Sequence, residues 1–248
     1  MQSIDRAMTV ANVLATHATD NGLSISELSK QCELPLSTMH RLLKAMIKQG
    51  MVEQDEPTKC YRLGTIWLEY GLKVYDSMDY ITKIRPELER LMKEVEESVY
   101  LSKPLGLEAI IIERIDSENN AIRIYDQLGL RIPMHIGAAN KAMLANMPTT
   151  KSNAILKSLL STEQLHTVEN SLKEIKQQGY AISHGERTEG TSSVAVAVRD
   201  GLGEVVGAVS VGFVSFNLTE SRLEFLIEKV VETGRRISEK LGSNATHN

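Results

Sequence analysis

The spacing of hydrophobic positions changes once along the chain, close to residue 80. Before that point apolar residues recur at helical spacing, apart from a short strand-like stretch near Tyr61. One further helix is predicted over residues 81–97. Strands are then predicted at residues 99–102, 109–115, 121–125, 193–199 and 205–213, and helices at residues 139–146, 150–160, 167–178 and 219–241.

This order of elements predicts two domains. A block of helices followed by a mixed region is typical of a small, mostly α-helical domain joined to an α+β domain. The stretch Asp200-Gly201-Leu202-Gly203 separates the last two strands and is a strong hairpin signal. We therefore expect the sheet of the second domain to be antiparallel.

Residues 23–50 carry the signals of two short helices joined by a tight turn. Ser24 and Glu27 form a capping box, which starts the first helix at Ser24. Pro35 disfavours helical geometry at Leu34, so the first helix ends before it, and a proline suits the first turn of the second helix. Gly50 is the signal for the C-terminus of the second helix. The buried face of the second helix is predicted to consist of Met39, Leu42, Leu43 and Met46.

The opposite face of the second helix is basic, and no acidic residue occurs from Leu34 to Met51. Residues 51–54 and 59–63, joined by a turn over residues 55–58, are predicted to form a β-hairpin wing after it. Two short helices and a wing are typical of a winged helix-turn-helix, whose second helix enters the major groove of DNA. The residues predicted to contact DNA are Arg6, Ser37, Thr38, His40, Arg41, Lys44, Lys59 and Arg62. The alternative is an ordinary surface helix pair whose basic face is merely solvated.

Charge limits how such a domain can bind DNA. The whole chain has a formal net charge of −4, and its first 80 residues carry ten acidic and eight basic side chains. Sequence-independent attraction to phosphates is therefore weak. We expect a dimer that reads two half-sites.

Several motifs in both halves also resemble one family. They are Ser3-Ile4-Asp5-Arg6-Ala7-Met8, Leu28-Ser29, residues 34–43, Tyr61-Arg62-Leu63-Gly64, Ile132-Pro133-Met134-His135, residues 141–145, Gly179-Tyr180-Ala181, and Glu186 four residues before Gly190. In this order they resemble IclR-type bacterial transcriptional regulators. The resemblance implies a winged helix-turn-helix DNA-binding domain over residues 1–64, a linking helix over 65–80 and a GAF-like effector-binding domain over 81–248. It also implies a homodimer or homotetramer, paired through the first helix near residues 8–17 and through the linking helix.

The second domain contains a candidate ligand site. Gly137 and two alanines precede a predicted helix, whose N-terminal amides suit a carboxylate. Ser193 and Ser210 lie on predicted strands and could offer hydroxyl groups to a small anion. In the family the effector site matches Ala138, Ala139, Ser183, Ser193, Ser210 and Gly212. The alternative is that these small residues only pack tightly and satisfy the backbone.

This site departs from the family at four positions. Ser183 stands where many members have an acidic residue, and Ser193 stands where a cysteine is frequent. Asn140 replaces the usual glycine before Lys141, and Gly212 replaces a frequent serine. The identity of the ligand therefore cannot be carried over from the family.

Other chemistry finds little support in the sequence. The six histidines lack the spacing of metal ligands, so we do not expect a metal site. If one existed, its best candidates would be His135, His184 and Glu186. The glycines at 201, 203 and 207 have the wrong spacing for a dinucleotide loop, and no nucleophile elbow occurs. We expect no cofactor, no metal and no enzymatic activity.

The expected protein is a cytoplasmic, ligand-responsive repressor that binds operator DNA and a small organic acid. Two cysteines, the lack of an apolar run of membrane length and the lack of a signal-peptide pattern support this location. The sequence does not decide whether the protein represses or activates transcription, or whether it assembles as a dimer or a tetramer. Two alternatives are an enzyme whose N-terminal domain only oligomerises, and a DNA-binding protein whose C-terminal domain has lost its ligand.

Overall fold

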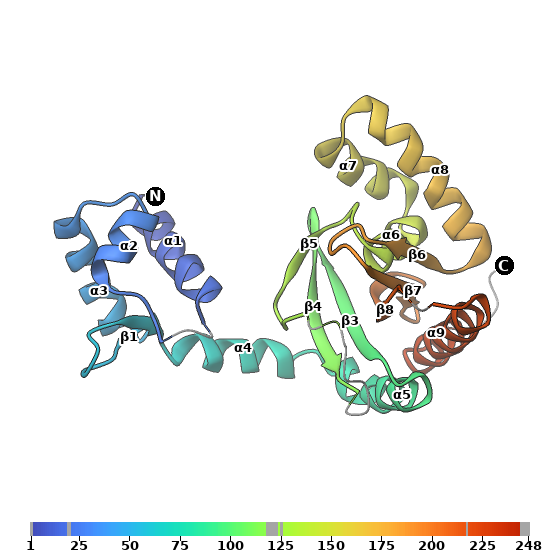
Figure 1. The fold of residues 1–248 in the computed structure, drawn as a ribbon, viewed down its shortest axis with the longest axis horizontal. Helices are drawn as coiled ribbons and strands as arrows, with labels where there is room; N and C mark the ends of the chain where they lie inside the picture. The colour runs from blue at the N-terminus through green and yellow to red at the C-terminus, as the bar shows by residue number, and fades with distance from the viewer. Residues whose placement is uncertain (1, 19–20, 118–123, 125, 217, 244–248) are drawn as a thin grey trace. The chain divides into compact units, whose positions relative to one another are not determined.

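The chain folds into two compact units, residues 1–79 and 80–248 (Figure 1). The computed structural model describes residues 2–18, 21–117, 124, 126–216 and 218–243. The first unit is helical with a two-stranded hairpin, and the second has a six-stranded antiparallel sheet flanked by helices. This architecture confirms the predicted fold class. Among the described residues, no helix combines the length and apolar character that a bilayer span requires.

The first unit contains the predicted helix-turn-helix and wing. Its elements are α1 (Gln2–Thr16), α2 (Ile25–Gln31), α3 (Leu36–Lys48), β1 (Val52–Gln54), β2 (Tyr61–Leu63) and α4 (Ile66–Asp76). Ser24 caps α2, and both halves of the capping box with Glu27 are present. Pro35 is the N-cap of α3, and Gly50 follows its C-cap with φ +68°.

A small apolar core holds these elements together. Val10 and Leu14 of α1 pack in one cluster with Leu28 of α2 and with Met39, Leu43 and Met46 of α3. Three of the four residues predicted for the buried face of α3 are thus fully buried, and Leu42 is partly buried. The wing joins the core through a close approach at Gly64, where a Cβ would lie 2.0 Å from the carbonyl oxygen of Gly50. Only glycine fits there, because any side chain would displace backbone.

The second unit is built on a sheet with the strand order β5-β4-β3-β8-β7-β6. Its strands are β3 (Ser98–Leu105), β4 (Glu108–Ile115), β5 (Arg131–Pro133), β6 (Ala181–His184), β7 (Thr191–Arg199) and β8 (Val205–Val214). Its helices are α5 (Tyr80–Val95), α6 (Ala138–Asn146), α7 (Thr149–Leu159), α8 (Thr162–Gln178) and α9 (Glu220–Lys240).

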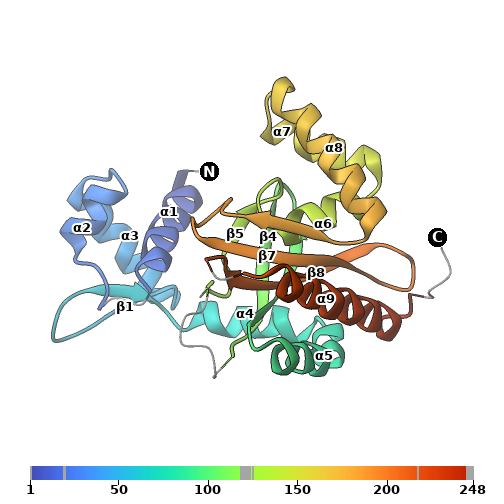
Figure 2. The same cartoon turned by 45° about the vertical axis from the view of Figure 1, so that its right-hand side comes forward.

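The two faces of the sheet differ in the size of their side chains. Helices α5 and α9 cover one face, and α6, with α7 and α8 outside it, covers the other (Figure 2). On the α5–α9 face, Val194, Val196 and Val198 of β7 pack with leucines and isoleucines of both helices. Alternate residues of the same strand, such as Ala195, face α6 and are small. This small-residue face is where the candidate ligand site lies.

The structure differs from the sequence prediction at several elements. Strands β5 and β6 were not predicted, because each is short and lies at an edge of the sheet. Helix α8 begins at Thr162, earlier than the predicted residue 167, because Ser161 and Gln164 form a second capping box. The strand expected at residues 121–125 falls almost wholly outside the described residues.

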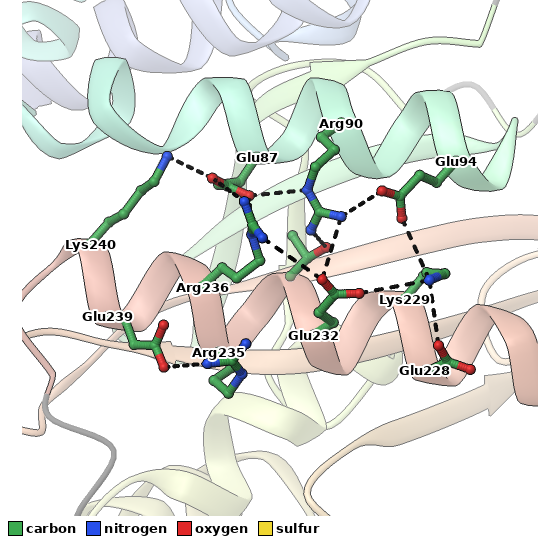
Figure 3. A network of polar contacts seen from close by, with 11 residues as sticks. Glu87, Arg90, Glu94, Glu228, Lys229, Glu232, Arg235, Arg236, Glu239 and Lys240 are labelled. Carbon is green, nitrogen blue, oxygen red and sulfur yellow. Dashed lines mark hydrogen bonds and ion pairs between the residues drawn. The ribbon is translucent and has the colours of Figure 1, made fainter.

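An ionic network joins α5 to α9 on the outer side of these helices (Figure 3). Its centre is Glu87, which is only 4% exposed. The carboxylate accepts hydrogen bonds from Arg236 Nε at 2.7 Å and Arg90 Nε at 3.2 Å, and Lys240 Nζ lies 2.6 Å away. These contacts, led by the one from Arg236, lower the pKa of Glu87 to about 2. The buried negative charge is stabilised because three cations surround it.

Glu87→Gln is expected to lower the free energy of unfolding by about 2 kcal/mol near neutral pH, because three cations lose a charged acceptor. The folded-state pKa lies below the ordinary value of 4.5, so this stabilisation is present above that pH. It is lost as the pH falls toward about 2. Urea titrations of both proteins at several pH values measure the difference.

Glu239→Gln is the matched control, since the pair of Glu239 with Arg235 is exposed. It should change the stability by less than about 0.5 kcal/mol. A difference between wild type and Glu87→Gln that does not narrow in acid would contradict the assigned pKa.

Candidate functional site

Helix α3 presents a basic surface that is not neutralised within the protein. Ser37, His40, Arg41, Lys44 and Lys48 are exposed, and Thr38 is partly buried. Within the described part of the chain, none of the three cations Arg41, Lys44 and Lys48 forms an ion pair. Their charges are therefore available to an external anion.

A groove runs between α3 and the wing beside this surface. It is lined by His40, Arg41, Leu43, Lys44, Ile47, Gln54 and Tyr61. Residues from both elements thus border one hollow.

The predicted basic residues of the wing are placed differently. Lys59 Nζ lies 2.7 Å from Glu56 Oε2, and Arg62 Nε lies 3.7 Å from Glu53 Oε2. Both pairs are exposed, so each holds its cation only weakly. Arg6, on α1, is exposed. The cations of α3 thus differ from Lys59 and Arg62, each of which has an acidic neighbour within the wing.

The second unit encloses a cavity of about 90 Å³ on the small-residue face of the sheet. All six residues expected there line it: Ala138, Ala139, Ser183, Ser193, Ser210 and Gly212. The lining also includes residues that sequence reasoning did not assign to the site: Tyr100, Ser102, Asp126, Arg187 and four isoleucines, at positions 111, 124, 132 and 136.

The register of the strands brings the six residues together. Ser193 of β7 lies opposite both Ser183 of β6 and Gly212 of β8. Ser210, two residues from Gly212 on the same strand, lies opposite Tyr100 of β3. Since residues two apart share a face, these side chains form one small, polar surface below the N-terminus of α6.

Two hydroxyl groups of this surface lack a partner. Within the described residues, neither Ser102 nor Ser210 makes a side-chain hydrogen bond, although both are almost buried. Ser193 Oγ donates to Ser183 Oγ over a long 3.5 Å. The cavity thus holds hydrogen-bonding capacity that a bound ligand could use.

The N-terminus of α6 is only partly open to a ligand, unlike the expectation from the sequence. The amide of Gly137 donates to Glu186 Oε2 at 2.9 Å, and Lys141 forms a short ion pair with the same carboxylate. Glu186 therefore occupies part of the positive end of the helix. The amides of Ala138 and Ala139, in the first turn, remain without an acceptor inside the helix.

Asn140 explains one departure from the family. Its side-chain amide donates to the carbonyl oxygens of Ile132 at 3.1 Å and Pro133 at 3.0 Å. The residue is 2% exposed. It therefore ties α6 to the end of β5, and its amide hydrogens are not available to a ligand.

Tyr100 connects the sheet to the segment before β5. Its hydroxyl group donates to the carbonyl oxygen of Ile124 at 2.6 Å and accepts from the amide of Asp126 at 3.4 Å. Burial raises the pKa of Tyr100, so its phenol stays protonated near neutral pH. The alternation of β3 could have identified Tyr100 as facing the small-residue side, but not Asp126, which follows in an irregular segment.

The described histidines are not gathered with other metal-binding side chains. Among the described residues, no three His, Cys, Asp or Glu side chains come together as metal ligands. His184 Nδ1 lies 2.8 Å from Ser192 Oγ, whereas Glu186 is engaged by Gly137 and Lys141. His135 Nδ1 is buried and has no hydrogen-bond partner in the described structure.

The chain matches two family models that together cover most of it. The model of the IclR helix-turn-helix domain matches residues 3–56. The model described as bacterial transcriptional regulator IclR C-terminal matches residues 72–239.

Similar proteins of known function are transcriptional regulators by name. The HTH-type transcriptional regulator KipR of Bacillus subtilis (strain 168) is 30% identical over 227 residues, which are 89% of this chain and 90% of KipR. The HTH-type transcriptional repressor AllR of Escherichia coli (strain K12) is 29% identical over 251 residues, 98% of this chain and 92% of AllR.

Solved structures share the fold over almost the whole chain. An IclR transcriptional regulator from Alicyclobacillus acidocaldarius gives a TM-score of 0.80 at 21% identity, covering 98% of this chain and 99% of the other. An IclR homolog from Microbacterium hydrocarbonoxydans, complexed with 4-hydroxybenzoate, gives a TM-score of 0.79 at 22% identity. The match covers 96% of this chain and 98% of the homolog.

Glu186→Gln is expected to lower the free energy of unfolding by about 2 kcal/mol, because Lys141 and the N-terminus of α6 lose a charged partner. Differential scanning calorimetry measures this loss. The control Glu189→Gln alters an exposed residue of the same loop and should leave the melting temperature unchanged. Equal effects of the two substitutions would show that Glu186 contributes no more than its net charge.

Proposed function

Because the chain belongs to the IclR family of bacterial transcriptional regulators, we propose that it is a repressor that leaves its operator when a small organic acid enters the cavity. The family consists of DNA-binding regulators and not of enzymes. In this proposal residues 1–64 bind DNA, residues 65–80 link the domains and residues 81–248 bind the effector. The observation that supports the ligand-sensing role is that the six residues expected from the family resemblance line one cavity.

DNA binding is proposed to centre on α3. Its side chains Ser37, Thr38, His40, Arg41 and Lys44 would meet the major groove, where the N-terminal part of a recognition helix reaches base edges. The absence of internal ion pairs at Arg41 and Lys44, both in the described structure, supports this role. Arg6, Lys59 and Arg62 would contact the phosphate backbone.

The modest charge of the first unit supports binding as an oligomer. With ten acidic and eight basic residues among the first 80, one copy has little general attraction to DNA. Two recognition helices in a homodimer, or four in a homotetramer, would add their specific contacts. Exposed apolar residues of α4, among them Leu68, Leu72 and Val74, are consistent with pairing through this helix.

A small organic acid is the ligand class that we propose for the cavity. The hydroxyl groups of Ser102 and Ser210, which have no partner among the described residues, and the open amides of Ala138 and Ala139 can all donate hydrogen bonds to oxygen atoms. The structural relative from Microbacterium hydrocarbonoxydans holds 4-hydroxybenzoate, which is an organic acid. The name of AllR as a repressor supports the direction of regulation.

Arg41→Ala is expected to weaken operator binding by about 1–3 kcal/mol if Arg41 contacts a base. A footprint of the neighbouring promoter locates the operator, and fluorescence anisotropy gives the affinity at fixed salt concentration. The control Arg235→Ala removes the same charge from an exposed pair on α9 and should leave the affinity unchanged. An unaltered binding isotherm for Arg41→Ala would remove Arg41 from the interface.

A panel of small carboxylic acids should contain one that raises the melting temperature and releases the operator. A ligand at about 100 times its Kd adds ~2.7 kcal/mol to the free energy of unfolding. Ser210→Ala should reduce the affinity for this acid about tenfold while barely changing the stability, because the hydroxyl has no partner in the part of the chain that the structure describes.

Ser158→Ala is the control for this experiment, since Ser158 is an exposed residue of α7 whose hydroxyl donates to the carbonyl oxygen of Ala154 in the same helix. It should leave both measurements unchanged. If no acid alters melting temperature or operator binding, the effector part of the proposal is wrong, and the C-terminal domain serves only to assemble the regulator.

A further inference from the structure

One ion pair stands at the edge of the cavity. Arg187, in the loop between β6 and β7, forms a short ion pair with Asp126, which lies in the segment before β5. Both residues line the cavity. Their side chains are 33% and 18% exposed, respectively, so the pair is partly shielded from water.

Arg187 is the only basic residue among the described residues that line the cavity. Lys141 lies nearby, but its ammonium group is held by Glu186. The acidic lining residues are Asp126 and Glu186. A carboxylate that entered without changing these contacts would add a third negative charge to a partly desolvated space, which is unfavourable.

An exchange of partners avoids this cost. A guanidinium group binds carboxylates in a planar, two-pronged geometry, and a ligand carboxylate can replace that of Asp126 like for like. Asp126 has other anchors, since its backbone carbonyl accepts from Arg114 Nη1 at 2.9 Å and its amide lies 3.4 Å from the Tyr100 hydroxyl. The backbone of Asp126 would thus stay in place after its carboxylate is displaced.

We propose that Arg187 selects anionic effectors, and that an effector carboxylate binds it by displacing Asp126. This inference rests on the proposed effector role of the cavity and names the residue that decides the charge of the ligand. A neutral ligand gains nothing from the exchange and leaves the ion pair in place. Because ligand and Asp126 compete for one guanidinium group, binding also breaks the tie between the β6–β7 loop and the segment before β5. A ligand that breaks this tie has different affinities for the tied and untied states, as an effector must.

The competing possibility is that the carboxylate binds only the amides of Ala138 and Ala139. In that case the affinity for acids would not depend on Arg187 or Asp126. Substitutions at these two positions therefore separate the two arrangements.

The experiment measures binding of two acids, lactate and 4-hydroxybenzoate, and of their neutral amides, lactamide and 4-hydroxybenzamide. Isothermal titration calorimetry on the full chain gives the affinities for wild type and for four variants: Asp126→Asn, Arg187→Gln, Arg187→Lys and the control Glu189→Gln. Glu189→Gln removes a negative charge from the same loop outside the cavity lining. Operator binding is followed in parallel by anisotropy.

Asp126→Asn should raise the affinity for the acids about tenfold, because the competitor is neutralised. Arg187→Gln should lower it by about the same factor, and Arg187→Lys should restore part of it. The amides should change less than about twofold in every variant, and Glu189→Gln should behave as wild type. The gain from Asp126→Asn should vanish when it is combined with Arg187→Gln.

Three results would overturn the inference. Acids that bind and release the operator with affinities independent of both residues would refute the exchange and leave the proposed function intact. Equal changes for acids and amides would show a general effect on the cavity instead of charge selection. In Asp126→Asn, Arg187 has lost its charged partner. If neither acid binds this variant, the role of Arg187 is refuted directly. Binding of the amides alone would still support an effector site.

Discussion

The antiparallel register of β7, β8 and β3 is the constraint on which the rest of the second unit depends. Alternation sends valines such as Val194 and Val209 toward α5 and α9, where they form the larger core. The same alternation leaves serine, glycine and alanine on the other face, and helix α6 cannot fill the space above them. One pairing pattern thus produces both the hydrophobic core and the cavity, and a shift by one residue would exchange them.

The charged residues of the second unit and those of helix α3 differ in whether they have partners inside the protein. In the second unit, two buried and two partly buried carboxylates are matched by cations of the same unit. Arg236 pairs with the buried Glu87 and Arg85 with the buried Glu113, whereas Lys141 pairs with Glu186 and Arg187 with Asp126. The basic residues of α3 have no such partners in the described structure. A cation that is already paired inside the protein contributes little to a new contact unless its partner is displaced. The charges of α3 are therefore available to an external anion, whereas Arg187 would require an exchange of partners.

The sequence alone determined the features that depend on local physics. The capping box of Ser24 and Glu27, the turn at Pro35 and the apolar stripe of Met39, Leu43 and Met46 are set by neighbouring residues, so the helix-turn-helix was predictable. The long strands and helices of the second unit were predictable for the same reason. The short edge strands β5 and β6 were not, because they depend on pairing with β4 and β7 and show little pattern of their own.

The tertiary structure decided what the residues of the cavity can do. The six expected residues came from family resemblance and small-residue patterns, but their meeting in one cavity depends on strand register. No local signal reveals that Glu186 caps α6, that Asn140 binds the end of β5, or that Arg187 reaches Asp126, 61 positions away in the chain. These contacts join segments that only the folded sheet brings together, because hydrogen bonds and ion pairs depend on distance in space and leave no periodic trace along the chain.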